Sequence, residues 1–126
     1  MKKLLPLLIL MSIVPAMPAK ANPAVNECYN SLIERPEARP ESAVVAMTVE
    51  HEGSQYHEIR ETYKRPQPNP KGTVFIRTDS SGACEKIMSF HEGSYPEISV
   101  YKERLGSEVL AKFQQAFRQQ QQEQAR

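Results

Sequence analysis

The chain has 126 residues, and its 16 lysine and arginine residues nearly balance its 15 aspartate and glutamate residues, for a formal net charge of +1. Nucleic-acid-binding proteins carry a concentrated positive surface that neutralises phosphates, so this near-neutral composition predicts no nucleic-acid partner. Once a predicted leader is removed, the remaining length is that of one small domain with a modest core.

Residues 1–21 have the organisation of a cleavable secretory signal. Lys2 and Lys3 form its basic start, residues 4–14 form an uncharged apolar run, and a segment of small residues ends at Ala21. The apolar run is about half of the ~20 residues that cross a bilayer, so we expect cleavage after Ala21 and no membrane span afterwards. Cleavage would remove three of the 16 basic residues and none of the 15 acidic ones, leaving 13 against 15. The mature protein is predicted to be exported to a periplasm, to the extracellular space or to a thylakoid lumen.

The first element of the mature chain is a short helix, predicted over residues 22–33. Its apolar side chains recur at helical spacing, at Val25, Cys28, Tyr29 and Leu32. Cys28 and Cys84 are the two cysteines of the sequence, and in an oxidising compartment we expect them to form a disulfide. They lack the Cys-x-x-Cys spacing of a redox-active pair.

A β-hairpin is predicted next, because residues 44–49 are rich in β-branched side chains and residues 55–63 alternate between apolar and polar. Between them, His51, Glu52 and Gly53 are expected to form a three-residue loop with a glycine bulge. This register predicts one apolar face, with His57 at its margin, made of Val45, Met47, Val49, Ile59 and Tyr63.

Three alternating prolines, Pro66, Pro68 and Pro70, follow the hairpin and predict an extended connector. A docking peptide for an aromatic-lined groove is the alternative interpretation. Residues 73–78 and 83–90 then read as a third and a fourth strand joined by a turn. The fourth strand is expected to present Cys84, Met88 and Phe90 on one face.

The C-terminal third is predicted to be helical. Ser94-Tyr95-Pro96-Glu97 has the pattern of a capping box, although residues 97–101 also alternate as a fifth strand would. Ser107 is expected to cap a second helix whose apolar stripe contains Val109, Leu110, Phe113, Ala116 and Phe117. Residues 119–126 are rich in glutamine and are predicted to be a flexible tail or a fraying helix end.

Residues 22–118 are therefore expected to form a single α+β domain: an N-terminal helix, a four-stranded antiparallel β-meander and two C-terminal helices packed on one sheet face. Over residues 24–89, this order of elements, with an Asp-x-x-Gly hairpin at residues 79–82, is loosely similar to small exported PepSY-type modules. Such modules are associated with binding and with the control of peptidases.

The tetrapeptide His-Glu-Gly-Ser occurs at residues 51–54 and again at residues 91–94. Both copies suit turns with exposed histidines, and no histidine pair has the spacing of a common metal motif, so we expect no metal and no cofactor. Glu58 and Glu61 are interpreted as part of a solvated strand face. No Gly-x-Ser-x-Gly motif indicates a serine nucleophile, so the protein is predicted not to be an enzyme.

The predicted function is that of a non-catalytic envelope protein which binds another protein or a peptide. The alternative is a small secreted hydrolase or metal-binding protein that uses His51, His57 and His91. We expect Phe113 to lie in a core under the C-terminal helices. The candidate interaction surface is the opposite sheet face, formed by Tyr56, Arg60, Phe75, Pro66, Pro68 and Pro70. The identity of the partner and the oligomeric state are left open by the sequence.

Overall fold

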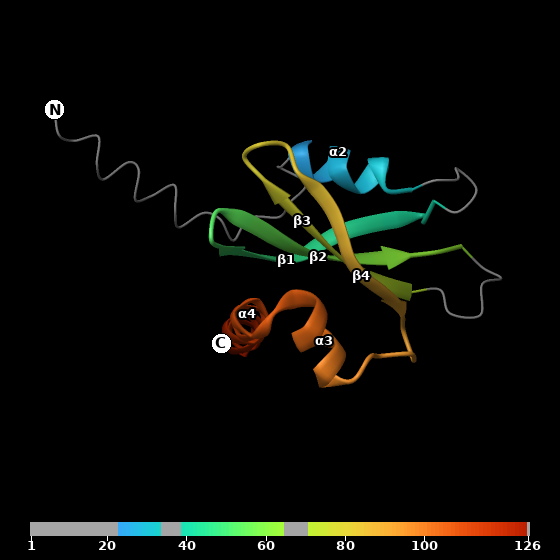
Figure 1. Cartoon of the computed structure of the whole chain (residues 1–126). Coiled ribbons are helices and arrows are strands. Elements are labelled where there is room, and N and C mark those ends of the chain that lie inside the picture. The colour runs from blue at the N-terminus through green and yellow to red at the C-terminus, as the bar shows by residue number, and fades with distance from the viewer. Residues whose placement is uncertain (1–22, 34–38, 65–70, 126) are drawn as a thin grey trace, which may run out of the picture.

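A computed structural model describes residues 23–33, 39–64 and 71–125. The predicted signal and the prolines Pro66, Pro68 and Pro70 lie outside the described residues. The described part has three layers, with α2 on one side of a single sheet and α3 and α4 on the other side (Figure 1). The helices are α2 (Pro23–Ser31), α3 (Ile98–Leu105) and α4 (Ser107–Gln124). None of the described helices is long and apolar enough to cross a membrane.

The sheet is the predicted antiparallel meander, with its strands in the order β1-β2-β3-β4. The strands are β1 (Ser42–His51), β2 (Ser54–Thr62), β3 (Lys71–Asp79) and β4 (Cys84–His91). The predicted α+β class and order of elements are therefore confirmed. Apolar side chains lie on both faces of this sheet, so both faces need cover, and each has its own helix layer.

Two apolar clusters lie on the two faces of the sheet. The cluster under α2 contains Val25, Cys28, Tyr29, Ile59, Val74 and Ile76. The cluster under α3 and α4 contains Met47, Val49, Phe75, Met88, Leu105, Val109, Leu110 and Phe113. The buried position of Phe113 beneath the helices agrees with the sequence-based expectation.

The β1–β2 turn is tighter than predicted. His51 pairs with Ser54, so the loop contains only Glu52 and Gly53, with φ angles of 52° and 82°. Two consecutive positive φ angles are characteristic of the type I′ turn, whose twist matches that of the flanking strands. The predicted three-residue loop is therefore wrong.

The extra residue of the hairpin lies within β1 instead. Val45 pairs with Ile59 and Met47 pairs with Glu58, which leaves Ala46 as a β-bulge. A bulge reverses the alternation of faces, so Val45 packs with Ile59 under α2, whereas Met47 packs under α4. The single apolar face predicted for this hairpin is wrong for that reason.

A second bulge interrupts the other edge strand, β4. Met88 pairs with Phe75 and Lys86 pairs with Ile76, so Ile87 has no partner in β3. The side chains of β4 before and after Ile87 consequently alternate in opposite phase. The edge strand β1 thus contributes to both apolar clusters, whereas β4 contributes to the cluster under α3 and α4 and reaches α2 through Cys84.

Because the bulge at Ile87 reverses the alternation of side chains along β4, Cys84 can point toward α2 and form the disulfide. The sulfur atoms of Cys28 in α2 and Cys84 in β4 lie at a bonding distance of 2.08 Å, which confirms the predicted pair. Met88 and Phe90 contact the cluster under α3 and α4. The expectation that Cys84 shares a face with Met88 and Phe90 is wrong, because the bulge lies between them.

Neither C-terminal helix begins at its predicted cap: α3 begins later than expected and α4 begins one residue earlier. The first is the helix α3 rather than a fifth strand, but it starts at Ile98, and Glu97 makes no side-chain capping hydrogen bond. Gly106, with a φ angle of 93°, precedes α4, so Ser107 already lies inside the helix instead of capping it. The predicted capping box and the predicted serine cap are both wrong.

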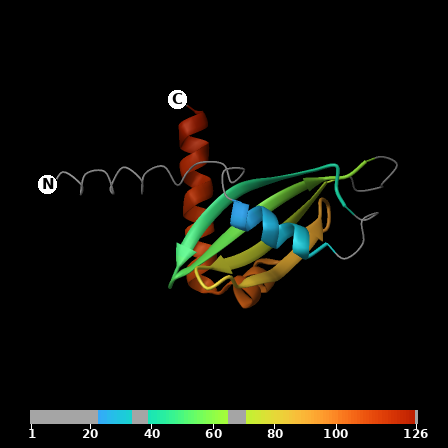
Figure 2. The same cartoon turned by 90° about the horizontal axis from the view of Figure 1, so that it is seen from above.

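Helix α4 runs beside the free edge of β1 and continues through Gln124, into the predicted tail (Figure 2). Lys112 Nζ donates a hydrogen bond to the carbonyl oxygen of Glu50 at 2.6 Å, and Gln120 Nε2 donates one to that of Ala46 at 3.1 Å. These side chains satisfy carbonyl groups that point away from β2. Such contacts protect an edge strand from pairing with another chain.

Candidate ligand-binding groove

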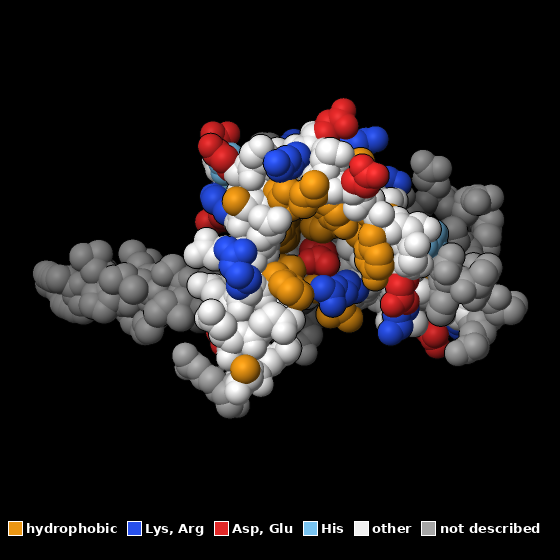
Figure 3. Space-filling model, turned by 90° about the horizontal axis from the view of Figure 1, so that it is seen from below, with side chains coloured by type: hydrophobic (Ala, Val, Ile, Leu, Met, Phe, Trp, Pro, Cys, Tyr) orange, Lys and Arg blue, Asp and Glu red, His pale blue; other side chains and the backbone are white. Residues whose placement is uncertain are grey.

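Helices α3 and α4 leave part of their sheet face open as a groove of about 770 Å³. Figure 3 shows this side of the molecule, where hydrophobic side chains surround a hollow in which charged side chains are visible. The groove is within the size range of small-ligand sites, which are concave and mostly apolar with a few polar groups. It is therefore the candidate functional site of the described chain.

Aromatic side chains from four elements (β3, β4, α3 and α4) and the β4–α3 connection form the walls of the groove. They are Phe75, Phe90, Tyr95, Tyr101, Phe113 and Phe117. Phe75 meets Phe113 edge to face with ring centroids 5.2 Å apart, and Phe90 meets Tyr101 at 5.9 Å. Edge-to-face packing holds the rings in fixed orientations. The groove is therefore preformed.

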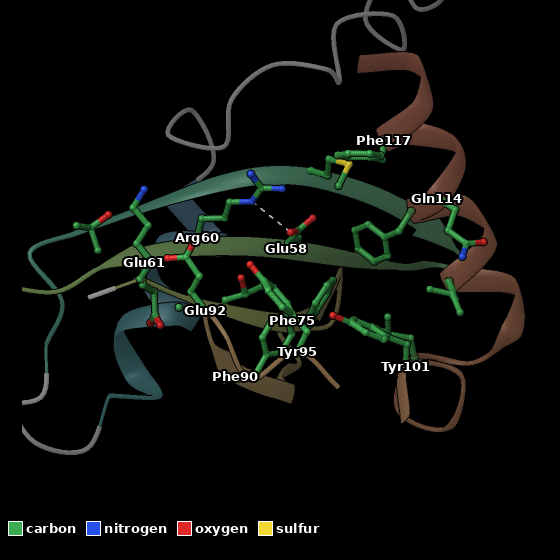
Figure 4. Close-up of a pocket in the computed structure, with 18 of the residues that line it drawn as sticks. Glu58, Arg60, Glu61, Phe75, Phe90, Glu92, Tyr95, Tyr101, Gln114 and Phe117 are labelled. Carbon is green, nitrogen blue, oxygen red and sulfur yellow. Dashed lines mark hydrogen bonds and ion pairs between the residues drawn. The ribbon is translucent and has the colours of Figure 1, made fainter. Parts of the chain in front are cut away.

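Two aromatic residues of the groove keep much of their surface exposed. Tyr95 is 65% exposed and Phe117 is 44% exposed. Tyr95 comes from the β4–α3 connection and Phe117 from the middle of α4 (Figure 4). Exposed aromatic surface beside a preformed hollow is typical of interaction sites.

Glu58 lies on the sheet floor of the groove, between Arg60 and the aromatic rings (Figure 4). Its side chain is only 12% exposed, whereas that of Arg60 is 57% exposed. Arg60 Nε donates a hydrogen bond of 3.3 Å to Glu58 Oε2. The two residues are two positions apart in β2 and so share a face. Burial, reinforced by the nearby Glu58 carboxylate, raises the pKa of Tyr101 in the facing helix.

Glu61, one position beyond Arg60, points to the α2 side and is buried. Tyr29 Oη donates to Glu61 Oε2 at 2.5 Å, and Tyr63 Oη donates to Oε1 at 2.9 Å. Burial and the Glu61 carboxylate raise the pKa of Tyr29 and raise that of Tyr63 to about 12, so both phenols keep the protons they donate. The interpretation of Glu58 and Glu61 as a solvated face is wrong, because helices cover both faces of β2.

The structure does not bring the three histidines together. His57 is buried under α2, with hydrogen bonds of 2.8 Å to Thr48 and 3.0 Å to Thr78, and burial lowers its pKa to about 4. It does not lie at the margin of a face, as predicted. His51 lies at the start of the β1–β2 turn, and His91 is exposed at the end of β4.

His51 has two carboxylate neighbours. Its Nε2 is 3.3 Å from Glu108 and 3.7 Å from Glu52, and both carboxylate side chains are largely exposed. These three residues are the described group whose ligand atoms lie close enough for a metal ion. Two exposed carboxylates beside one histidine also make an ordinary surface ion pair.

The predicted interaction surface is placed differently from the expectation. Phe75 is only 5% exposed and packs on Phe113, and Tyr56 packs against the same cluster. Arg60 lines the groove on that same face. These three residues therefore lie on the face that carries α3 and α4, and the opposite face is covered by α2. The prolines of the predicted surface lie outside the described residues.

Several groove residues were not identified from the sequence. Phe90 was assigned to a strand face and Tyr95 to a helix cap. Tyr101 was placed only within the segment that could be a helix or a fifth strand. The alternation of β2 could have paired Glu58 with Arg60. The low exposure of Glu58 could not have been inferred locally, because it depends on the packing of helices that begin at Ile98 and Ser107, far away in sequence.

Comparisons of the chain with protein-family models, with curated proteins and with solved structures gave no match. None of these comparisons supports the resemblance to PepSY-type modules, which remains an expectation from the order of elements.

Proposed function

We propose that this protein is an exported, non-catalytic binding protein which holds a peptide or a segment of a partner protein in the groove beside α3 and α4. The observation that carries the proposal is the preformed aromatic groove of about 770 Å³ with Phe117 and Tyr95 exposed beside it. Aromatic side chains dominate the binding energy of many interfaces, because they bury large areas at a small cost in conformational entropy.

The composition of the groove supports binding over catalysis. Among its described lining residues there is no histidine, cysteine or serine, so neither a Ser–His nor a Cys–His catalytic pair is assembled there. The charged groups are instead set among fixed aromatic rings, an arrangement suited to recognition.

Two observations support export. The leader has the basic, apolar and small-residue segments of a secretory signal. The Cys28–Cys84 bond is of a kind that persists in oxidising compartments.

Selection from a library of displayed random peptides tests the proposal. Peptides retained by the oxidised protein should lose at least about tenfold in affinity when Phe117 or Tyr95 is changed to Ser, the usual consequence of removing an aromatic anchor. Val44→Ser is the matched control, because Val44 is 60% exposed and lies outside the groove. Recovery of no binder, or equal binding by all three variants, would refute the proposal.

A further inference from the structure

Within the groove, the Glu58 carboxylate can accept more hydrogen bonds than it does in the protein alone. Its Oε2 accepts the hydrogen bond from Arg60, whereas its Oε1 has no hydrogen bond or ion pair with any described residue. Among the described residues, every fully buried side-chain oxygen has a hydrogen-bond partner. Because Glu58 Oε1 has no such partner, it is not fully buried and can be reached from the groove. A carboxylate can accept about four hydrogen bonds, and here one is used within the protein.

The present partner of Glu58 is easily displaced. The Arg60 side chain is 57% exposed and contacts the carboxylate through Nε alone, at 3.3 Å, rather than through the two-pronged geometry of a strong arginine–carboxylate pair. Because the arginine side of the pair is exposed to solvent and makes a single contact, the pair contributes less free energy than a two-pronged buried one. Arg60 can therefore turn outward at low cost when another cation reaches Glu58.

The surroundings of Glu58 favour a cation with an extended apolar or planar body. Phe75 lies directly across from it on β3, Tyr101 is close to it in α3, and Phe90 lines the same groove. A guanidinium or ammonium group is attracted to the face of an aromatic ring. Displacing solvent from such a site strengthens the attraction of the carboxylate. Arginine combines planar stacking with paired donors for a carboxylate.

The charges of the groove are also ordered by depth. Glu58 lies on the floor, while the exposed charged residues of the lining are three basic ones, Arg60, Lys71 and Arg118, and one acidic one, Glu92. An acidic or fatty-acid ligand would have to place its apolar part against the Glu58 carboxylate. A basic side chain entering from outside meets the carboxylate on the floor and leaves its own backbone carbonyl groups near the basic rim.

We propose that the groove recognises a basic residue, preferably arginine, flanked by apolar residues in a peptide, and that Glu58 is its counter-ion in place of Arg60. This inference rests on the proposed peptide-binding function and names the chemistry that the groove selects.

A pair of isosteric peptides tests it. Acetyl-Leu-Arg-Leu-amide and the same peptide with citrulline, which has the shape of arginine without its charge, are titrated into the oxidised ¹⁵N-labelled protein. The arginine peptide should shift the amide signals of Glu58, Phe90 and Tyr101 in a saturable way. The citrulline peptide should bind at least about fivefold more weakly, the difference expected for one partly desolvated charge.

Two variants should act in opposite directions. Glu58→Gln should abolish the preference for arginine over citrulline. Arg60→Gln should strengthen binding of the arginine peptide about two- to fivefold, because it removes the competing cation. Glu85→Gln is the matched control, since Glu85 forms an exposed pair with Arg77 elsewhere in the described sheet and should leave binding unchanged. The opposite response of Arg60→Gln keeps the test decisive even where Glu58→Gln fails to fold.

Equal binding of the two peptides, weaker binding by Arg60→Gln, or no shift of groove signals would overturn this inference. The peptide selection described above tests the proposed function independently of the preference for arginine. A library that yields neutral groove-binding peptides would leave the proposed function standing while the preference for arginine fails.

Discussion

The polar residues of strand β2 are hydrogen-bonded differently on the two faces of the sheet. Toward α2, β2 directs His57 and Glu61, which are buried and whose polar atoms all find partners inside the fold. Toward α3 and α4, the same strand directs Glu58 and Arg60, which border an open groove and satisfy each other only in part. Buried polar groups that are fully satisfied stabilise one conformation, whereas partly satisfied groups beside a hollow are available to a ligand.

This contrast separates a structural face from a recognition face. The α2 face also carries the Cys28–Cys84 bond, which ties the helix to β4. The groove face carries the exposed aromatic residues Tyr95 and Phe117. Changes on the α2 face should therefore alter stability alone. Changes at the groove should alter binding, except where a groove residue also belongs to the core.

Phe113 is such a core residue, and its loss should have the largest effect on stability. Its side chain is 5% exposed and contacts Phe75 beneath α4. Phe113→Ala should lower the free energy of unfolding by about 3–5 kcal/mol, because truncation leaves a cavity that the rigid sheet cannot fill. Urea denaturation measures the change. A loss below about 1 kcal/mol would mean that α4 is not docked on the sheet as described.

Removing the disulfide tests how much the face covered by α2 contributes to stability. The bond joins residues separated by 56 positions, and Cys28→Ser/Cys84→Ser should destabilise the protein by about 2–5 kcal/mol, chiefly by releasing the unfolded chain. Thermal unfolding of the oxidised protein and of the double variant provides the comparison. Two free thiols titrated in protein from its native compartment would contradict the bond itself.

Acidification should weaken the same face through His57. Burial lowers its pKa to about 4 in the folded protein, below the value of about 6.5 expected in the unfolded chain, so the unfolded state takes up the proton first. The resulting stability is fully present above about pH 6.5 and is lost as the pH falls toward 4. The shift corresponds to at most about 3 kcal/mol.

Unfolding measured between pH 7 and pH 4 checks this dependence. His57→Gln keeps hydrogen-bonding capacity toward Thr48 and Thr78 but cannot take up a proton, so this variant should lose less stability over the same range. His51 and His91 remain in both proteins and serve as internal references. Parallel curves for the two proteins would show that His57 is not the group responsible.

The order of elements could be predicted from the sequence because it depends on local signals. Helical spacing around Cys28, alternation in β2 and turn residues between strands each act over a few positions. The two bulges could not be predicted in this way. Whether an extra residue enters the turn or the strand depends on which pairing buries more apolar surface. The sequence around Ala46 and Ile87 contains no local signal for a bulge.

The missed bulges also explain why Phe75 was assigned to the wrong face of the sheet. With Val45 and Met47 assigned to one face, the hairpin offered one apolar side and one polar side, and Phe75 was assigned to the uncovered side. The bulge at Ala46 divides the apolar residues between both faces, so each face needs a helix layer. The groove then arises from incomplete cover by α3 and α4, which is a property of packing between distant segments.

The smallest expected effect on stability is the sharpest test of the contrast between the faces. Phe117 lies one helical turn beyond Phe113 in α4, but it is 44% exposed where Phe113 is 5% exposed. Phe117→Ser should therefore change the free energy of unfolding by no more than about 0.5 kcal/mol. The same substitution should weaken groove-binding peptides at least about tenfold, because it removes an aromatic anchor from the wall of the groove. Urea denaturation and peptide titration of this one variant give both numbers. A large loss of stability with unchanged binding would place Phe117 in the core and would remove the exposed aromatic surface on which a recognition role for this face depends.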